Sequence, residues 1–243
     1  MNAPLQLSRR DLLKGSSALV VAFSLAPHLE ALAQDAAPAK PVSLDQVDTF
    51  LAIDDKGMVT LYAGKVDLGT GVNIGLAQIV AEELDVPLAN VNLVTGDTAL
   101  TPDQGPTYGS QSIQSGGMQI RQAAATARNA LLDRAAQRLN VAKDDLAINE
   151  GVIAPKAGGT GVAYQDLIGG KDFMLKVDPA APMKSPADYK LVGKPVARRD
   201  IPEKLTGRFT YMHDFRMPGM LHGSVIRPPA FGATLQNVDE SSI

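Results

Sequence analysis

Two short runs of small residues, each placed directly before a predicted helix, constrain this chain most strongly. The first run is Gly69-Thr70-Gly71, and apolar residues recur at helical spacing after it from Val72 to Leu84. The second run, Thr107–Ser112, lies in a loop predicted over 105–117, before an Ala-rich stretch that predicts a helix over 118–139. Such turns leave the N–H groups of a helix N-terminus accessible. Together they favour a large, anionic, phosphorylated ligand that lies across both helix starts.

Either run alone is more typical of ordinary structure than of a binding site. A Gly-x-Gly sequence that opens a helix is usually only a tight turn, and Ser and Gly are common in loops. Asp97, between the two runs, is compatible with the same site but more typical of a turn-capping residue. A strand predicted at Val91–Thr95 would bring both helix starts to one edge of a sheet, so the combination indicates a shared site.

The remaining periodicities predict an α+β fold of two unequal parts. Before residue 190, strands are predicted at 49–53, 58–63, 91–95, 146–148 and 152–153. They accompany the two helices, and a short helix near 164–168, in one expected α/β segment. A new unit is predicted from Leu191, with strands at 208–211 and 221–226 on either side of a Pro218-Gly219 turn. We expect this second unit to be incomplete on its own, because no partner strand is evident for 221–226.

Composition excludes several classes of function. With 45% hydrophobic and 20% charged residues, the 243-residue chain has the composition of a globular protein. A net charge of −3, 5% aromatic residues and no Trp argue against a nucleic-acid binder. The absence of Cys excludes an iron–sulfur cluster, a CxxCH haem site, a thiol nucleophile and a disulfide framework within these residues.

Polar residues outside the two runs give no catalytic or metal-binding pattern. Glu82 and Glu83 fall in the first predicted helix without an evident partner, which predicts a solvated helix face. His213 and His222 have no Cys or spaced carboxylates near them, so no metal site is predicted there. The sequence contains no P-loop, nucleophile elbow or His-x-x-x-His motif. We therefore assign no catalytic residue and no metal ligand.

The N-terminal residues are typical of a targeting segment. Ser8–Lys14 resembles a twin-arginine motif, and an apolar stretch over 15–27 and an Ala31-Leu32-Ala33 cleavage site follow it. We therefore expect a signal peptide over 1–33, export to the periplasm, and a Pro/Ala linker over 34–44. A short N-terminal helix or a membrane anchor is the alternative, although the apolar run is short for a membrane span. Since twin-arginine export usually carries folded proteins with an inserted cofactor, it is a second indication of one.

Two longer stretches resemble a known family. Gly64–Arg128, which contains GKVDLGTGVNIGLAQIVAEELDVPLANVNLVTGDT and GSQSIQSGG, resembles the molybdenum-cofactor-binding region of the large subunits of the xanthine dehydrogenase/aldehyde oxidase family, in particular the isoquinoline 1-oxidoreductase β-subunit type. Residues 192–229, with PGMLHG and RPP, resemble the start of the family's α/β hammerhead domain. The resemblance implies a molybdenum-cofactor-binding segment over 45–156, a linker over 157–190 and the start of a hammerhead domain over 191–243.

The resemblance also implies which residues bind the cofactor. The family's Gly-Gln-Gly turn, which holds the pterin, is matched by Gly69, Thr70 and Gly71. Thr70 replaces the family's Gln, and its shorter hydroxyl departs from the family's side-chain contact. The Ser-rich loop that binds the pterin and phosphate portion is matched by Gly109, Ser110, Gln111 and Ser112. No residue matches the family's catalytic Glu, which lies near the end of the large subunit. We therefore expect an N-terminal portion of a larger subunit that is inactive alone.

The function implied by the resemblance is that of a periplasmic molybdenum hydroxylase. Such enzymes oxidise an aldehyde or an N-heterocycle and hold molybdenum in molybdopterin, in bacteria commonly the cytosine dinucleotide form. The implied partners are the rest of the molybdenum subunit, a small 2Fe–2S subunit and a cytochrome c subunit. The alternative is a non-catalytic scaffold protein that retains the partner-subunit interface. An exported solute-binding protein is disfavoured, because no two-lobed repeat is visible.

Overall fold

The computed structural model describes residues 43–241. The signal peptide predicted over 1–33, and nearly all of the linker predicted over 34–44, lie outside the described residues. The chain divides after Ala197 into two compact units, each described by itself. No helix within residues 43–241 is long and apolar enough to cross a membrane.

The first sheet has three strands in the order β1 (Leu51–Ile53), β2 (Val59–Ala63) and β3 (Val91–Thr95). A hairpin joins β1 and β2, and Asp54 stabilises its turn by accepting the N–H groups of Lys56 and Met58. β3 pairs with β2 in parallel. Parallel strands need a crossover connection, which here is helix α4 (Val72–Leu84) followed by the 3₁₀ turn η1 (Leu88–Asn90).

A short helix replaces part of a predicted strand. The strand predicted over 49–53 is helical at its start, since α3 (Val47–Phe50) precedes β1. Contacts with a distant part of the chain account for this difference. The Asp48 carboxylate accepts the N–H groups of Phe173 at 2.5 Å and Met174 at 2.7 Å, so α3 is fixed by a segment more than 120 residues later in the chain.

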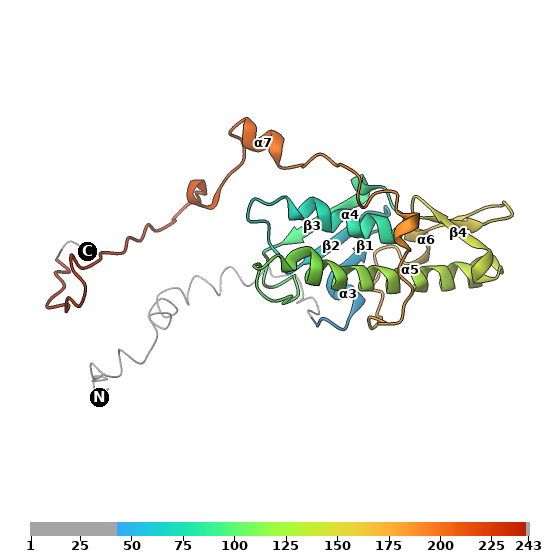
Figure 1. The fold of residues 1–243 in the computed structure, drawn as a ribbon, viewed down its shortest axis with the longest axis horizontal. Coiled ribbons are helices and arrows are strands. Elements are labelled where there is room, and N and C mark those ends of the chain that lie inside the picture. Colours follow the sequence, from blue (N-terminus) through green and yellow to red (C-terminus); the bar gives the residue numbers. More distant parts are fainter. Residues whose placement is uncertain (1–42, 242–243) are drawn as a thin grey trace. The chain divides into compact units, whose positions relative to one another are not determined.

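Helices α4 and α5 (Met118–Leu139) run lengthwise along the first unit (Figure 1). A π-helix, η2 (Ser112–Gly117), leads into α5, so the loop predicted over 105–117 is wrong for its second half. Small residues let the helices approach closely. A Cβ added at Gly117 would lie 2.9 Å from Ile79 Cδ1, and five alanines of α5 are buried: Ala123, Ala124, Ala125, Ala127 and Ala135.

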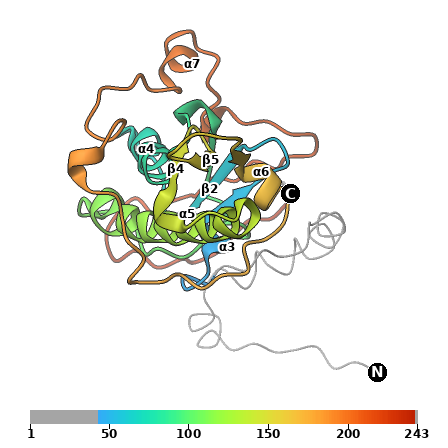
Figure 2. The same ribbon diagram turned by 90° about the vertical axis from the view of Figure 1, so that its right-hand side faces the viewer.

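The second sheet is an antiparallel meander that lies at one end of the same unit (Figure 1) and faces the viewer in Figure 2. It consists of β4 (Leu146–Asn149), β5 (Val152–Pro155) and β6 (Val162–Ala163), with the turn η3 (Lys143–Asp145) before it and helix α6 (Tyr164–Leu167) after it. Tyr164 joins this sheet to α4, because its buried hydroxyl donates to Leu84 O at 2.7 Å. Burial raises the pKa of this phenol well above its ordinary range.

Residues 178–194, which we call the strap, are fastened to α4 and α5. The strap includes the 3₁₀ turn η4 (Pro186–Asp188) and belongs to the first compact unit, whereas the sequence predicts a linker over 157–190. Glu82 and Glu83 explain the difference. Their exposed fractions are 3% and 1%, so the solvated face predicted for them is wrong. Glu82 accepts three consecutive strap N–H groups, and Glu83 accepts the N–H of Lys184.

The second unit, residues 198–241, contains helix α7 (Ile201–Leu205) and the 3₁₀ turn η5 (Met212–Asp214). The strands predicted over 208–211 and 221–226 are wrong, since neither stretch forms a strand here. A strand is stable when its N–H and C=O groups pair with a neighbour and one face is covered. In the described residues neither stretch pairs with a neighbouring strand: Arg208 N and Phe209 N donate to Glu203 O instead, and Leu221 and Ile226 are 88% and 96% exposed.

Candidate functional site

The two predicted turns lie on neighbouring loops at one edge of the first sheet. The first loop, 64–71, connects β2 to α4, and the second, 96–111, connects β3 to η2. Because β2 and β3 are parallel and adjacent, their carboxyl ends meet at the same edge, where α/β folds commonly bind ligands. Val66 N donates to Thr107 Oγ1 at 3.1 Å, and Gly64 N donates to Gln104 Oε1 at 3.0 Å. The loops are therefore in direct contact.

Two buried polar side chains, Lys65 and Gln104, form hydrogen bonds between the two loops on the side that faces the protein interior. The Lys65 ammonium donates to Gly105 O at 3.1 Å and Pro106 O at 2.8 Å, while the side chain is 2% exposed. The Gln104 amide donates to Gly116 O at 3.0 Å and also to α5, so it links both loops to η2. Neither residue is among those predicted for the site. Lys65 immediately follows Gly64 in the motif, but nothing in the sequence indicates that it is buried.

The first turn has its own carboxylate cap. Gly69 and Gly71 have φ angles of 102° and 79°, which glycine adopts without strain. Asp67 Oδ1 accepts the N–H groups of both glycines, at 2.8 and 3.1 Å, and Oδ2 accepts that of Asn73 at 3.4 Å. These N–H groups, expected from the sequence to face a phosphate, are thus already bound to a carboxylate. An added Cβ at Gly69 would meet no atom within 4 Å, so the turn's outer side is open.

A buried acceptor without a hydrogen-bond partner lies in the first turn of α4. Asn73 Oδ1 is buried and has no hydrogen-bond partner, the one such side-chain atom among residues 43–241. Buried polar atoms are almost always satisfied in folded proteins. This oxygen therefore indicates a missing donor at the start of α4, beside the first turn.

The second turn has a strained backbone that leads into the π-helix. Gly109 and Ser110 both have a φ of 59°, and for Ser this conformation is unfavourable. Gln111 N donates to Tyr108 O at 3.1 Å, and no side chain caps the start of η2. π-Helical turns and strained residues both concentrate at functional sites. Ser110 and Gln111 are exposed, so this turn presents N–H groups and polar side chains to solvent.

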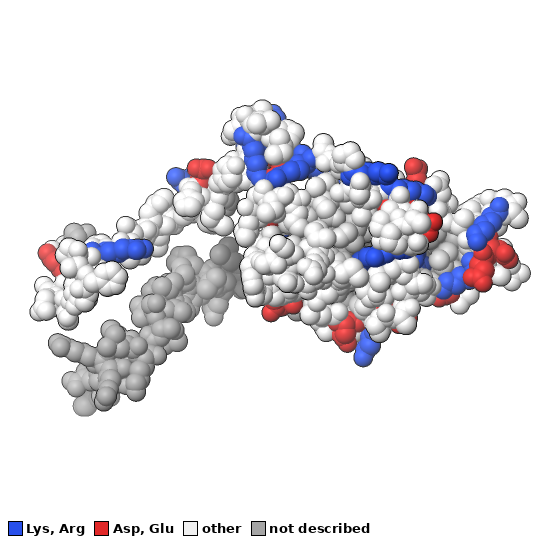
Figure 3. Space-filling view, viewed as in Figure 1, with Lys and Arg blue, Asp and Glu red and all other residues white. Residues whose placement is uncertain are grey.

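The structure thus brings six of the seven predicted site residues to adjoining loops, and the seventh, Ser112, begins η2 directly after the second loop. Asp97 accepts the N–H groups of Ala99 and Leu100, which confirms the turn-capping role rather than one in the site. Within residues 43–241 no cluster of His, Cys, Asp or Glu has the composition of a metal site. On the face shown in Figure 3, basic and acidic side chains are interleaved near the β4–β5 end, without a large basic area.

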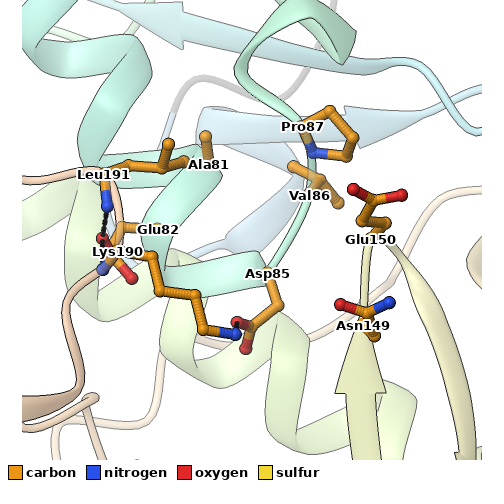
Figure 4. Close-up of a pocket in the computed structure, with 9 residues that line it drawn as sticks. All are labelled: Ala81, Glu82, Asp85, Val86, Pro87, Asn149, Glu150, Lys190 and Leu191. Atoms are coloured by element: carbon orange, nitrogen blue, oxygen red, sulfur yellow. Dashed lines mark hydrogen bonds and ion pairs between the residues drawn. The ribbon is translucent and has the colours of Figure 1, made fainter.

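A hollow lies at the C-terminal end of α4 (Figure 4), whereas the first turn precedes the start of that helix. Its lining comes from the end of α4, the β4–β5 turn and the strap: Ala81, Glu82, Asp85, Val86, Pro87, Asn149, Glu150, Lys190 and Leu191. Three of its charged lining residues form ion pairs: Glu82 and Asp85 with Lys184, at 3.0 and 2.7 Å, and Lys190 with Asp85 at 3.7 Å. Burial by itself would raise the pKa of Glu82, but the strap N–H groups and Lys184 outweigh burial and lower it. This hollow is a structural joint.

Comparisons with known proteins agree with the family resemblance that the sequence around the two turns indicates. Residues 11–211 match the molybdopterin cofactor-binding domain family. The chain is 42% identical over its whole length to a polypeptide of the nicotinate dehydrogenase of Pseudomonas putida, and spans 21% of that polypeptide. It is 26% identical over 98% of its length to the beta chain of the isoquinoline 1-oxidoreductase of Brevundimonas diminuta, and spans 35% of that protein.

Among solved structures, CO dehydrogenase from Oligotropha carboxidovorans is similar with a TM-score of 0.44 and 27% identity, over 48% of this chain and 15% of that one. The family match covers most of the chain, including both turns, the π-helix and the strap. The chain belongs to the molybdopterin cofactor-binding domain family, within the molybdenum-binding subunits of the xanthine dehydrogenase family.

Proposed function

We propose that this chain forms part of the molybdopterin-binding subunit of a molybdenum hydroxylase that oxidises an N-heterocycle or an aldehyde. The observation that carries the proposal is the contact between the two loops, which places both predicted cofactor turns at one sheet edge. The names of two relatives, a nicotinate dehydrogenase and an isoquinoline oxidoreductase, favour the N-heterocycle. Since the chain spans 21% of the first relative, activity belongs to the assembled enzyme.

The geometry of the first turn fits the pterin better than the phosphate. The Asp67 carboxylate already accepts the N–H groups of Gly69 and Gly71, and its negative charge would repel a phosphate. Pterin rings carry N–H donors, and the unpartnered Asn73 Oδ1 is an acceptor beside the turn. The open outer side of Gly69 leaves room for a ring to approach the backbone.

The geometry of the second turn fits the phosphate portion. The start of η2 has no side-chain cap, and the first N–H groups of a helix attract anions. Ser110, Gln111 and Ser112 add hydroxyl and amide donors, and an added Cβ at Gly109 would have its nearest neighbour at 3.9 Å. When bound, the molybdenum cofactor supplies the two-electron oxidation that hydroxylates the substrate carbon. The residues of this chain bind and orient it.

The location and partners form the rest of the proposal. The twin-arginine motif at Ser8–Lys14 supports export to the periplasm. These 243 residues contain no Cys, so the electron carriers lie outside them, and we propose a 2Fe–2S subunit and a cytochrome c subunit for that role. We further propose the cytosine dinucleotide form of the cofactor, and a hammerhead domain that begins near residue 191. Each is checked by the composition and structure of the purified complex.

The test is a matched pair of glycine substitutions in the assembled enzyme. Gly69 and Gly158 have φ angles of 102° and 95°, and neither has an atom within 4 Å of an added Cβ, so Val strains both backbones alike. We expect one molybdenum per wild-type subunit, a similar content in Gly158→Val, and a large loss in Gly69→Val. Equal molybdenum in both variants would overturn the assigned turn. A wild-type complex without molybdenum would instead support the scaffold alternative.

A further inference from the structure

Lys65 lies between the two loops, in the segment that leads from β2 to the first turn. Its side chain is 2% exposed and extends under the second loop, where the ammonium donates to Gly105 O and Pro106 O. The stem passes across η2, since an added Cβ at Gly116 would lie 2.8 Å from Lys65 Cγ. One side chain of the first loop therefore fixes both the second loop and the start of the π-helix.

The charge of Lys65 is compensated only by neutral groups. Within residues 43–241 no carboxylate forms an ion pair with its ammonium, and the acceptors are two backbone carbonyls. By contrast Lys184, whose side chain is 11% exposed, has two carboxylate partners, Glu82 and Asp85. Buried charges are costly unless they are paired. An unpaired buried cation under an exposed, N–H-rich turn is an arrangement that an anionic ligand would stabilise.

We propose that Lys65 is a positioning residue for the cofactor. Its hydrogen bonds set the second turn against the first, and its charge makes the potential at Gly109–Ser112 favourable for a phosphate. Gln104 supports the same joint through Gly64 N and Gly116 O. The inference rests on the proposed function, because it assumes that the two turns hold one anionic cofactor.

The experiment compares lysine substitutions in the assembled enzyme. Lys65→Met removes the charge and the hydrogen bonds but keeps the stem, whereas Lys65→Arg keeps the charge and donors. Lys184→Met is the control, since it removes a partly buried, hydrogen-bonded lysine that contacts the other end of α4. Readouts are molybdenum per subunit, thermal unfolding, and hydrogen exchange of the amides at 64–71 and 104–112. Neither the metal analysis nor the exchange measurement depends on turnover.

We expect Lys65→Met to lower the molybdenum content at least about tenfold, the factor that corresponds to losing one hydrogen bond to a charged group. Exchange in both loops should rise in this variant. Lys65→Arg should retain most of the molybdenum, and Lys184→Met should retain it despite a lower unfolding temperature. If Lys65→Met does not fold, Lys65→Gln replaces it with the same expectation.

Two results separate the inference from the proposed function. Wild-type molybdenum content in folded Lys65→Met or Lys65→Gln would overturn the role of Lys65 and leave the two turns as the cofactor site. A loss in Lys184→Met as large as that in Lys65→Met would also overturn it, because general destabilisation would then explain both. A wild-type enzyme without molybdenum would overturn the proposed function itself.

Discussion

Replacing Glu82 by Ala should detach the strap from α4. Glu82 Oε2 accepts the N–H groups of Lys190, Leu191 and Val192 at 2.8, 2.6 and 3.0 Å, and Oε1 accepts the Lys184 ammonium at 3.0 Å. The variant removes a charged acceptor that is 3% exposed and shared by four donors.

The expected loss of unfolding free energy is about 3 kcal/mol. A hydrogen bond to a charged group contributes about 1.5–3 kcal/mol. The sum for the three strap N–H groups is therefore larger than the expected loss. Two effects reduce it. Leu191 and Val192 are only half-buried, so water satisfies their N–H groups once the strap opens. Lys184 also keeps its bond to Asp85 at 2.7 Å. Glu82→Gln retains one acceptor oxygen and should lose about half as much.

Urea unfolding followed by circular dichroism measures the loss, and limited proteolysis locates it. We expect Glu82→Ala to gain cleavage sites within residues 178–194 that the wild type protects. The control is Asp133→Ala, which removes an exposed ion pair with Lys143 and should change the free energy by less than about 1 kcal/mol. If Glu82→Ala is no less stable than this control, the buried carboxylate does not hold the strap.

Three further predictions follow from single sites. The pKa of Glu82 is lower in the folded chain than its ordinary value of 4.5, so the stability that its carboxylate contributes is complete above that pH and is lost as the pH falls through the folded pKa. In urea titrations at acid pH, the difference in unfolding free energy between wild type and Glu82→Gln should therefore shrink. A difference that stays constant with pH would contradict this. Ser110→Gly relieves the strain of a φ of 59° and should raise the free energy of unfolding by about 0.5–1 kcal/mol, while the molybdenum content falls. A lower free energy of unfolding would show that Ser110 is not strained. Gly64→Ala places a Cβ 1.8 Å from Pro102 O and should cost more than about 2 kcal/mol in chemical unfolding, against almost nothing for Gly223→Ala, where no atom lies within 4 Å; equal costs would refute the close approach.

The regular elements of the first unit could be predicted from local sequence. Both long helices begin and end at the predicted residues, and β3 has the predicted bounds, because apolar periodicity records which face is buried. The π-helix η2 could not be predicted, since Ser112–Gly117 has the composition of a loop and is helical through its contacts with α4 and Gln104.

Long-range polar contacts account for the other errors. The partners of Glu82 and Glu83 include Lys184, about a hundred residues later in the chain, and no local pattern marks such a pair. The strands predicted over 208–211 and 221–226 failed because a strand also needs a neighbour, which local sequence does not specify.

The position of the candidate site could be predicted from the sequence, but the side-chain contacts that build it could not. Small residues before two helices identify both turns, and a strand between them predicts that they meet. The sequence does not show that Asp67 fills the first turn, nor that Lys65 and Gln104 join the loops from within. These contacts depend on how the two loops pack, which no spacing of residues reveals.

The most direct test of the shared cofactor site is a molybdenum anomalous difference map from crystals of the assembled enzyme. We predict cofactor density in contact with both turns, with the pterin beside Gly69–Gly71 and the phosphate portion beside Gly109–Ser112. A molybdenum peak whose cofactor touches neither turn, or only one of them, would contradict the account.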